Sequence, residues 1–438
     1  MTRRVAVVGA GVAGLSAAYH LRNECDVTVF EQSSVLGGHA HTVEVQEGER
    51  TLGLDTAFIV FNPVHYPGLT AFFADLDVAS VEHRGGFNFF DLDTGEQFGS
   101  DELELPTETV EQRYGESFVR MHAEARRFYA QAPRDCVRGR AELPLGEYLQ
   151  VNGYSDAFRY GFVMALATAV WSVPMERIWE MPAATLITFF SAHGAGGLGG
   201  RSVQWHTVAG GSISYVRKAV AALGRAGVRV RTDAQVRDVH EVGDEVLIST
   251  GSGVESFDRV VLATHADQAL AALRQPTAEQ RMLADVRYNA TTVLLHTDET
   301  ILPAQRERWR SWNYGRVERA GRPHGFVVYY LNELQSLRAE KDYFVTLDCP
   351  RELRDEKVIA ELHYTHPILT VPVRRMQSAL RAMNENSRIK MCGSYFAARG
   401  IGPDVIASHE AAFDSGAAVA ESVLSDVGGR TLSGSHRA

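Results

Sequence analysis

The chain has 438 residues, of which 45% are hydrophobic and 22% charged, so it is long enough for two or three globular domains with a large buried core. Its net charge of −10 argues against a general nucleic-acid binder, because such proteins meet phosphates with a cationic surface. Its four cysteines lie far apart and form no CxxC pair, which indicates neither a disulfide framework nor a zinc site and fits a reducing cytoplasm.

The first residues, MTRRVAVVGAGVAGLSAAYHL, combine two arginines with an apolar stretch, as a signal peptide does. Glycines fall where a secretory core would carry leucine, however, and no cleavage site follows. No apolar run reaches the roughly 18 residues that span a bilayer, and GFVMALATAVW at 161–171 suits a buried helix instead. We therefore expect a cytoplasmic protein without a targeting segment.

A strand, a glycine turn and a helix are predicted at the start of the chain. Residues 4–8 form a short β-branched run, typical of a parallel strand buried on both faces. Gly9, Gly11 and Gly14 follow in G-x-G-x-x-G spacing, before LSAAYHLRN with helical periodicity. In such a turn the first glycine bends the chain, the second admits a pyrophosphate and the third lets the helix pack on the strand. This context predicts a dinucleotide-binding turn.

A second predicted strand, residues 26–30, ends in Glu31. An acid at this point accepts hydrogen bonds from the hydroxyls of an adenosine ribose and repels a 2′-phosphate. The pattern fits NAD or FAD.

The next residues resemble the flavin amine oxidase and phytoene desaturase superfamily. Its motif runs from an acid through Gly-Gly and a basic residue to Thr or Ser, and Glu31, Gly37, Gly38, His39 and Thr42 follow that order. The resemblance implies FAD as the cofactor, with these residues beside it.

The chain departs from that motif at its two arginines. Val35 stands where the family has an arginine before the glycines, and His39 stands where it has the second one. His39 is expected to contact the flavin or its pyrophosphate, with a structural loop histidine as the alternative. His39 and His41 could instead be metal ligands, but no third ligand is marked nearby, so no metal is expected.

The resemblance extends to a bacterial subgroup of predicted FAD-binding oxidoreductases. That subgroup usually carries Gly where Ala57 stands. The matching segments are spread over most of the chain: 54–76, 151–174, 206–223, 257–270 and 310–315.

Further elements of the flavin domain are predicted along the chain. Residues 214–223 form an amphipathic helix, and 228–242 form a strand, a turn and a strand. The resemblance places Val236 at the adenine. It also places Gly393 and Ser394, which end a strand, at the flavin, although the family often has an acid where Ser394 stands. In the superfamily the last helix, here 411–424, directs its N-terminus at the flavin pyrimidine ring.

The expected fold is α/β, with a Rossmann-type, glutathione-reductase-like FAD-binding domain and an inserted α+β substrate domain. Residues 1–60, 205–270 and 385–438 would form the FAD-binding domain, and residues 61–204 and 271–384 the substrate domain. Two further segments are predicted to lack regular structure: a loop at 193–202 and the polar tail from 428.

The resemblance implies an FAD-dependent oxidoreductase, a dehydrogenase or desaturase that takes hydride onto flavin N5 from an apolar substrate such as an acyl chain or polyene. The substrate domain is dense in aromatic residues, which serve a core or a pocket. No catalytic residue is assigned. The alternatives are a flavin-dependent double-bond isomerase, an amine oxidase, and a non-catalytic flavin- or lipid-binding protein. The lack of a lysine in any recognisable motif disfavours the amine oxidase, and the complete glycine and Glu31 set disfavours the non-catalytic protein.

Residues 306–322 carry six arginines interleaved with Trp309, Trp312 and Tyr314. A water-insoluble substrate arrives from an anionic membrane or an acidic carrier, and such a segment could dock on either. The alternative is a solvated loop whose tryptophans pack inward.

Overall fold

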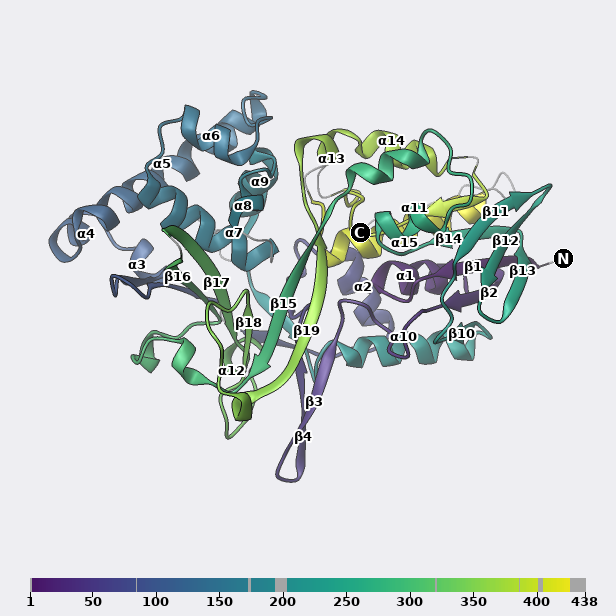
Figure 1. Ribbon diagram of the computed structural model, residues 1–438, viewed down its shortest axis with the longest axis horizontal. Helices are drawn as coiled ribbons and strands as arrows, with labels where there is room; N and C mark the ends of the chain where they lie inside the picture. Colours follow the sequence, from purple (N-terminus) through teal and green to yellow (C-terminus); the bar gives the residue numbers. More distant parts are fainter. Residues whose placement is uncertain are drawn as a thin grey trace.

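The computed structural model describes residues 2–83, 85–171, 175–193, 203–319, 321–385, 387–400 and 405–425. Residues 194–202 of the expected loop and the tail from 428 lie outside these ranges. Figure 1 shows two halves side by side, with the long strands β15 and β19 between them.

The first half is built on a sheet of five parallel strands in the order β10-β2-β1-β14-β20. Their bounds are Arg229–Arg231 for β10, Cys25–Phe30 for β2, Arg3–Val8 for β1, Arg259–Leu262 for β14 and Ile389–Met391 for β20. Val7 pairs with Val29 on one side and Val261 on the other. Such apolar strands are stable only when both faces of the sheet are covered.

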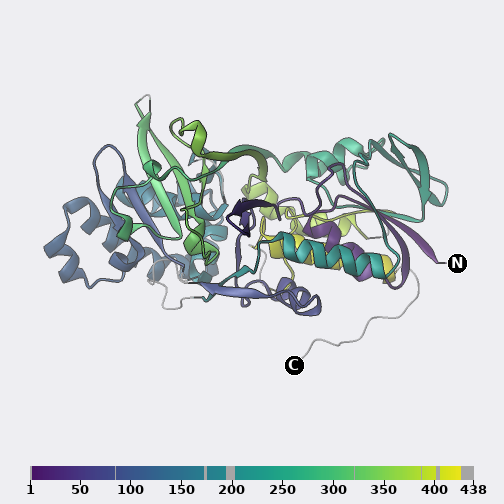
Figure 2. The same ribbon diagram turned by 90° about the horizontal axis from the view of Figure 1, so that it is seen from below.

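One face is covered by α1 (Val12–Leu21), α10 (Ile213–Arg225) and α15 (His409–Ser425). Figure 2 shows α10 running along this face. Helices α1 and α15 pack very closely, because a Cβ at Gly416 would lie 2.1 Å from the Ala13 carbonyl oxygen. Gly416 is therefore needed for this contact.

The opposite face is covered by a β-meander and several short helices. They are β11 (Asp238–Val242), β12 (Glu245–Thr250), β13 (Gly253–Phe257), α11 (Ala266–Ala272), the 3-10 turn Gln280–Asp285, α13 (Val371–Arg375) and α14 (Gln377–Met383). A parallel sheet with helices on one face, and a β-meander with short helices on the other, confirms the expected Rossmann-type, glutathione-reductase-like architecture.

The second half contains a mixed sheet of seven strands in the order β19-β15-β18-β17-β16-β7-β8. Their bounds are Val358–Pro367, Tyr288–His296, Phe344–Leu347, Arg322–Tyr330, Trp312–Arg319, Phe87–Asp91 and Gln97–Gly99 in that order. The pairs are antiparallel except β7 with β16, where Phe87 faces Trp312. This half confirms the predicted α+β character.

A helical layer packs on this sheet (Figure 1). Its helices are α3 (Ser100–Leu103), α4 (Thr107–Arg113), α5 (Glu116–Val137), α6 (Leu145–Val151), the π-helix Ala157–Val163, α7 (Met164–Trp171), α8 (Met175–Ile178) and α9 (Ala183–His193). Their core is aromatic: Phe128, Phe158, Phe162 and Phe190 are each at most 1% exposed.

Small elements complete the chain. They are the hairpin β3 (Thr42–Glu47) and β4 (Arg50–Asp55), the sheet β5 (Val60–Phe61), β9 (Trp205–Val208) and β6 (Ser80–His83), α2 (Pro67–Asp75), α12 (Leu331–Leu334), and 3-10 turns at Glu299–Ile301, Arg306–Arg308 and Asp355–Lys357. Within the described ranges, no helix is long and apolar enough to cross a membrane.

The packing of helices α2, α13 and α14 indicates to which half each of them belongs. In α2, the Phe72 ring lies 5.0 Å from Phe413 of α15, and the Phe73 ring lies 5.1 Å from Tyr215 of α10. Helices α13 and α14 join the core on the other face of the parallel sheet. We therefore propose that these three helices belong to the dinucleotide-binding half, although the sequence places them in segments 61–204 and 271–384.

Candidate active site

A large cavity of about 1380 Å³ extends from the parallel sheet into the second half. It exceeds the roughly 300–1,000 Å³ of ordinary small-molecule sites. It is lined by the last residues of β1, β2 and β14, which are Val8, Phe30 and Leu262. Ligands of open α/β sheets bind at these carboxyl ends. The cavity has room for a dinucleotide and a second molecule.

The glycine turn forms the floor of this cavity. Gly9 has a φ of +101°, and a Cβ at Gly14 would lie 1.9 Å from the Gly9 carbonyl oxygen. A Cβ at Gly11 would meet nothing within 4 Å, because this residue faces the cavity. Helix α1 begins directly after it, with no side-chain cap and no acid in its first turn. Its free N–H groups and positive dipole end suit an anion.

Glu31 lies at one end of the cavity, beside the segment that contains Val236. Its Oε2 accepts the Ala10 N–H at 2.8 Å, and its Oε1 accepts the Ser33 N–H at 2.9 Å. The Glu31 carbonyl also accepts the Ala234 N–H at 2.8 Å, which fixes the segment leading to Val236. The structure thus brings these two predicted site residues together.

Gly37 and Gly38 lie against the glycine turn. The Gly37 N–H donates to the Ala10 carbonyl at 3.0 Å, and a Cβ at Gly38 would lie 3.2 Å from the Gly11 Cα. A side chain at Gly38 would therefore press on the turn at Gly11, whereas a Cβ at Gly37 would lie 2.6 Å from the Ala40 carbonyl oxygen.

Thr42 is placed differently, because it is not among the residues that line the cavity. Its hydroxyl donates to Asp55 Oδ1 at 2.5 Å and accepts the Ile213 N–H at 3.0 Å. Asp55 also accepts the Ser212 N–H at 2.8 Å, and burial raises the pKa of Asp55 to about 6. Thr42 therefore joins the β3–β4 hairpin to the start of α10.

Gly393 and Ser394 line the cavity after β20. The Gly393 N–H donates to Ser415 Oγ at 2.9 Å, and the Ser394 carbonyl accepts the Ala407 N–H at 2.7 Å. These bonds hold the turn against the first part of α15.

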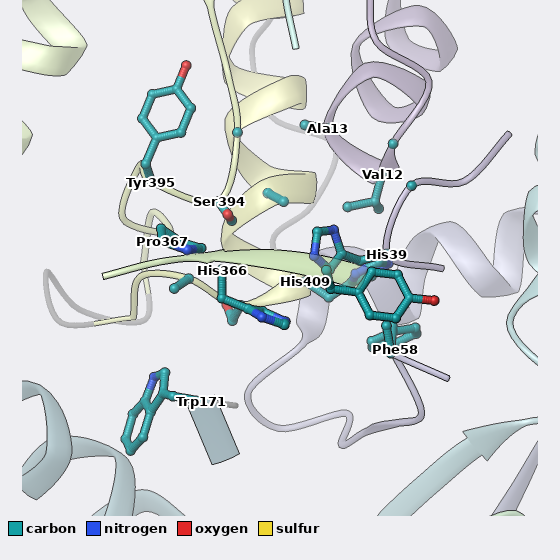
Figure 3. Close-up of a pocket in the computed structure, with 18 of the residues that line it drawn as sticks. Val12, Ala13, His39, Phe58, Trp171, His366, Pro367, Ser394, Tyr395 and His409 are labelled. Carbon is teal, nitrogen blue, oxygen red and sulfur yellow. The ribbon is translucent and has the colours of Figure 1, made fainter. Parts of the chain in front are cut away.

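Histidines gather in the cavity, and Figure 3 shows His39, His366 and His409 near one another. We call His39, His265, His366 and His409 the histidine wall. The His39 ring centroid lies 5.1 Å from that of His366 and 5.9 Å from that of His265. His39 Nε2 and His366 Nδ1 are buried and have no hydrogen-bond partner among the described residues. Burial and the neighbouring imidazoles lower the pKa of His39 to about 3 and that of His366 to about 4. The rings are therefore neutral.

His41 does not share this site. Its Nδ1 lies 2.9 Å from the Thr56 hydroxyl and 3.0 Å from the Tyr364 hydroxyl, away from His39. Within the described ranges, no three His, Cys, Asp or Glu side chains are arranged to hold a metal ion.

Sequence reasoning missed His265, His366 and His409 as cavity residues. His265 follows β14, and no sequence motif marks any of the three. All three come from distant segments: the loop after β14, the end of β19 and the start of α15. Alternation along β19 does place Tyr364 and His366 on one face, but sequence alone does not say what that face meets.

The far end of the cavity is mostly apolar. Its described lining includes Phe58, Ile59, Val60, Phe87, Leu166, Trp171, Phe189, Phe190, Trp205, Trp312, Tyr329 and Ile406. Polar residues also line this end: His83, Ser100, Asp101, Glu104, Thr188 and Gln204. Some aromatic residues of the second half thus form a pocket, whereas Phe89 and Phe90 lie in the core.

None of the four lysines lines the cavity. Lys390 is buried in β20, where its Nζ donates to the Asn384 carbonyl at 2.7 Å. Lys218 lies near Asp77 on α10, and Lys341 and Lys357 lie in the second half.

The arginine-rich segment is a 3-10 turn and a strand rather than a loop. Trp309 is 7% exposed and Tyr314 is 2% exposed, while Trp312 lines the cavity. Four of the arginines pair with acids of the same chain: Arg306 with Glu299, Arg308 with Glu102, Arg310 with Asp101 and Arg316 with Asp91. The aromatic side chains pack inward.

Comparison with solved structures finds the same architecture over nearly the whole chain. Putrescine oxidase bound to putrescine has a TM-score of 0.68 at 14% identity, covering 97% of this chain and 99% of that one. Cyclohexylamine oxidase from Brevibacterium oxydans has a TM-score of 0.69 at 12% identity, covering 98% and 100%. The CLA-producing fatty acid isomerase from P. acnes has a TM-score of 0.62 at 16% identity, covering 94% and 97%. At these identities the likeness shows the fold alone.

No curated protein matches the chain. The family model for flavin containing amine oxidoreductases, in contrast, matches residues 12–424. This match spans both halves and confirms the superfamily expected from the sequence. The chain therefore belongs to the flavin containing amine oxidoreductase family, and it is a flavin-dependent oxidoreductase.

Proposed function

We propose that the chain is an FAD-dependent dehydrogenase or desaturase that takes hydride from an apolar substrate such as an acyl chain or polyene. The observation that carries the substrate class is the far end of the cavity, where aromatic and aliphatic side chains form most of the wall and no lysine is present.

Three features of the near end support FAD. Gly11 leaves backbone open for a pyrophosphate, and Glu31 and Val236 line the place where an adenosine would lie. Each Glu31 oxygen accepts one backbone N–H, and a carboxylate has about four acceptor sites, so capacity remains for ribose hydroxyls. FMN lacks the adenosine and would leave this end unused. When bound, the flavin supplies the redox chemistry by accepting hydride at N5.

The other predicted contacts are proposed on the same geometry. Gly37 and Gly38 would leave space beside the cofactor, and Gly393 and Ser394 would meet it from the opposite wall. His39, with a buried and unpaired Nε2, would hydrogen-bond to the cofactor where the family has an arginine. Thr42 would act indirectly, by holding β3 against α10 through Asp55.

The residues of the second half would bind and orient the substrate and exclude water from it. Trp171 and Phe189 pack at 5.0 Å between ring centroids and present apolar surface to the cavity. Burying apolar surface contributes about 25 cal/mol per Å² to binding. Excluding water from the reacting bond also protects the hydride transfer from side reactions.

Amine oxidation and isomerisation are the competing reactions. Amine oxidases of this superfamily typically place a lysine near N5, and no lysine lines this cavity. Isomerisation would use the same apolar cavity without net oxidation, and a CLA-producing fatty acid isomerase has this fold. Delivery of the substrate from a membrane or carrier is a further part of the proposal. We do not assign it to the arginine-rich segment, because four arginines of that segment pair with acids of this chain, and charge reversal tests this below.

The cofactor is tested first. Heat-denatured protein should release a yellow compound that co-elutes with FAD. FMN in the supernatant, or a colourless protein, would contradict this part, and colour that stays with the polypeptide would show a covalent link.

The substrate class is tested by anaerobic mixing. An acyl thioester or polyene should bleach the visible flavin band, whereas a primary amine of matched chain length should not. Bleaching by the amine alone would contradict the proposal. A shifted double bond in the recovered lipid, without bleaching, would assign the isomerase instead.

A further inference from the structure

His409 begins α15 at the cavity wall, and its ring is held on two sides. Its face stacks on Phe58, with 3.8 Å between ring centroids and 9° between planes. Its Nε2 lies 2.7 Å from the hydroxyl of Tyr215, a residue of α10 that is 0% exposed. Figure 3 shows His409 close to His39 and Phe58 at the pocket wall. Three separate segments thus fix one imidazole.

The Tyr215 hydroxyl decides which nitrogen of His409 carries the proton. Burial raises the pKa of Tyr215 well above its ordinary value, so the phenol keeps its proton. Among the described residues His409 Nε2 is its only hydrogen-bond partner, and a buried donor without an acceptor costs about 1–3 kcal/mol. The phenol therefore donates to the Nε2 lone pair.

The remaining proton must then lie on Nδ1. Burial and the nearby His39 lower the pKa of His409 to about 3, so the neutral ring carries one proton. Nδ1 has no hydrogen bond to a described residue, yet it is not among the buried unpaired atoms, and the residue lines the cavity. An N–H donor therefore opens on the cavity.

The position of this donor relates it to one end of the cofactor. If the adenosine lies at Glu31 and the pyrophosphate at Gly11, the ring system must extend toward the other walls, where Ser394, His409 and Ala412 lie. An isoalloxazine has hydrogen-bond acceptors along its pyrimidine edge and only hydrocarbon along its dimethylbenzene edge. A fixed N–H donor matches the pyrimidine edge.

Resting on the proposed function, we propose that Tyr215 and His409 set the redox balance of the bound flavin. Tyr215 is the positioning residue, and His409 Nδ1–H is the donor that contacts the pyrimidine edge. A donor there stabilises negative charge, as the N-terminus of α15 does, and so favours the reduced cofactor over the oxidised one. The neighbouring Glu410 does not compete for this donor, because its carboxylate accepts the Gly68 and Leu69 N–H groups at 2.8 and 2.9 Å.

Two amide substitutions at His409 distinguish the role of Nδ1 from that of Nε2. In H409N the side-chain amide lies near the Nδ1 position and keeps a donor toward the cavity. In H409Q the amide reaches the Nε2 position, so it keeps the Tyr215 contact and loses the donor. H65Q is the matched control, because His65 also lines the cavity but has its Nδ1 2.9 Å from Asn62 Oδ1.

The measurements are the midpoint potential and the sulfite affinity of the purified holoprotein, with flavin content and thermal melting recorded for each variant. H409Q should lower sulfite affinity roughly ten- to a hundredfold, the loss of one hydrogen bond to a charged group. Its potential should fall by about 30 mV for each factor of ten. H409N and H65Q should stay within a factor of about three of wild type.

Tyr215→Phe supplies an independent test. It keeps the aromatic ring but removes the hydroxyl that fixes the His409 proton on Nδ1. It should lower sulfite affinity in the same direction as H409Q and by less. Equal losses in H409N and H409Q, or no loss in H409Q and Y215F, would overturn the inference. If H409Q does not retain flavin, Y215F decides. A wild-type protein without flavin would overturn the proposed function itself, which is a different result.

Discussion

The glycine turn and the histidine wall enclose the same cavity, but they are built in opposite ways. Between Gly9 and Gly38 the chain offers backbone and empty space, and a Cβ at Gly9 or Gly14 would meet a backbone carbonyl oxygen, that of Ala263 or of Gly9. The histidine wall, in contrast, consists of side chains from four separate segments: His39, His265, His366 and His409. Changes in the turn should therefore act through space and backbone, and changes in the wall through side-chain chemistry.

The largest expected effect is that of Gly14→Ala, which tests the role of space in the turn. The new Cβ would lie 1.9 Å from the Gly9 carbonyl oxygen, so α1 must move off the sheet. We expect destabilisation of about 3 kcal/mol or more, measured by chemical denaturation of the apoprotein. Gly11→Ala is the contrast, because its Cβ meets no atom: the apoprotein should keep its stability and lose FAD affinity. Equal stability losses in both variants would contradict this division.

Glu31→Ala comes second, because the Glu31 carboxylate accepts the N–H of Ala10, within the turn, at 2.8 Å. Loss of a charge-assisted bond of roughly 1.5–3 kcal/mol should weaken FAD binding about ten- to a hundredfold, measured by fluorescence titration. The apoprotein must be melted in parallel, since Glu31 also accepts two backbone N–H groups. Glu49→Ala in the β3–β4 hairpin is the control. Unchanged FAD affinity would show that Glu31 does not bind the ribose.

The pH dependence of stability tests whether the buried imidazoles of the histidine wall stay neutral in the folded protein. His366 has a pKa lowered from 6.5 to about 4, so below pH 6.5 the unfolded chain binds a proton that the folded apoprotein does not. Its contribution to stability is complete above pH 6.5 and is lost as the pH falls toward 4, by at most about 1.4 kcal/mol for each pH unit. Asp55 and Glu410, with pKa values raised to about 6 and about 7, have the opposite sign, so only a difference between variants is informative.

His366→Leu should accordingly reduce the loss of apoprotein stability between pH 6.5 and 4, measured by denaturation at each pH. His363→Leu is the control, because the side chain of His363 is 69% exposed on the same strand. A His366→Leu profile that follows the wild type in parallel would show that this imidazole takes up its proton in the folded state as well.

The smallest effect is expected outside the cavity, at the arginine-rich segment. Arg308 and Arg316 already pair with Glu102 and Asp91, and pairs near the surface contribute roughly 0.2–1 kcal/mol. Reversing both charges should therefore lower turnover of a vesicle-presented and a short soluble substrate equally, by less than about threefold. A selective, salt-sensitive loss with the vesicle-presented substrate would instead support docking through this segment.

The sequence determined the glycine turn with its flanking strands and helix, because these depend on residues close together in the chain. The other parallel strands, β10, β14 and β20, come from distant segments. A β-branched strand, three glycines and an apolar helix specify one local geometry, and Glu31 must follow the neighbouring strand. The sequence also indicated an aromatic second half. It did not indicate which aromatic residues face the cavity, because a buried ring has the same pattern in a core as in a pocket.

Only the tertiary structure decided the histidine wall and the place of Thr42. The four histidines have no common spacing in the sequence. The order of the strands and the packing of α15 on α1 bring them together. Thr42 matches the family motif, yet Asp55 and Ser212, folded against it from β4 and α10, hold its hydroxyl away from the cavity. Local patterns specify backbone geometry, whereas the surroundings of a side chain depend on segments that are remote in sequence.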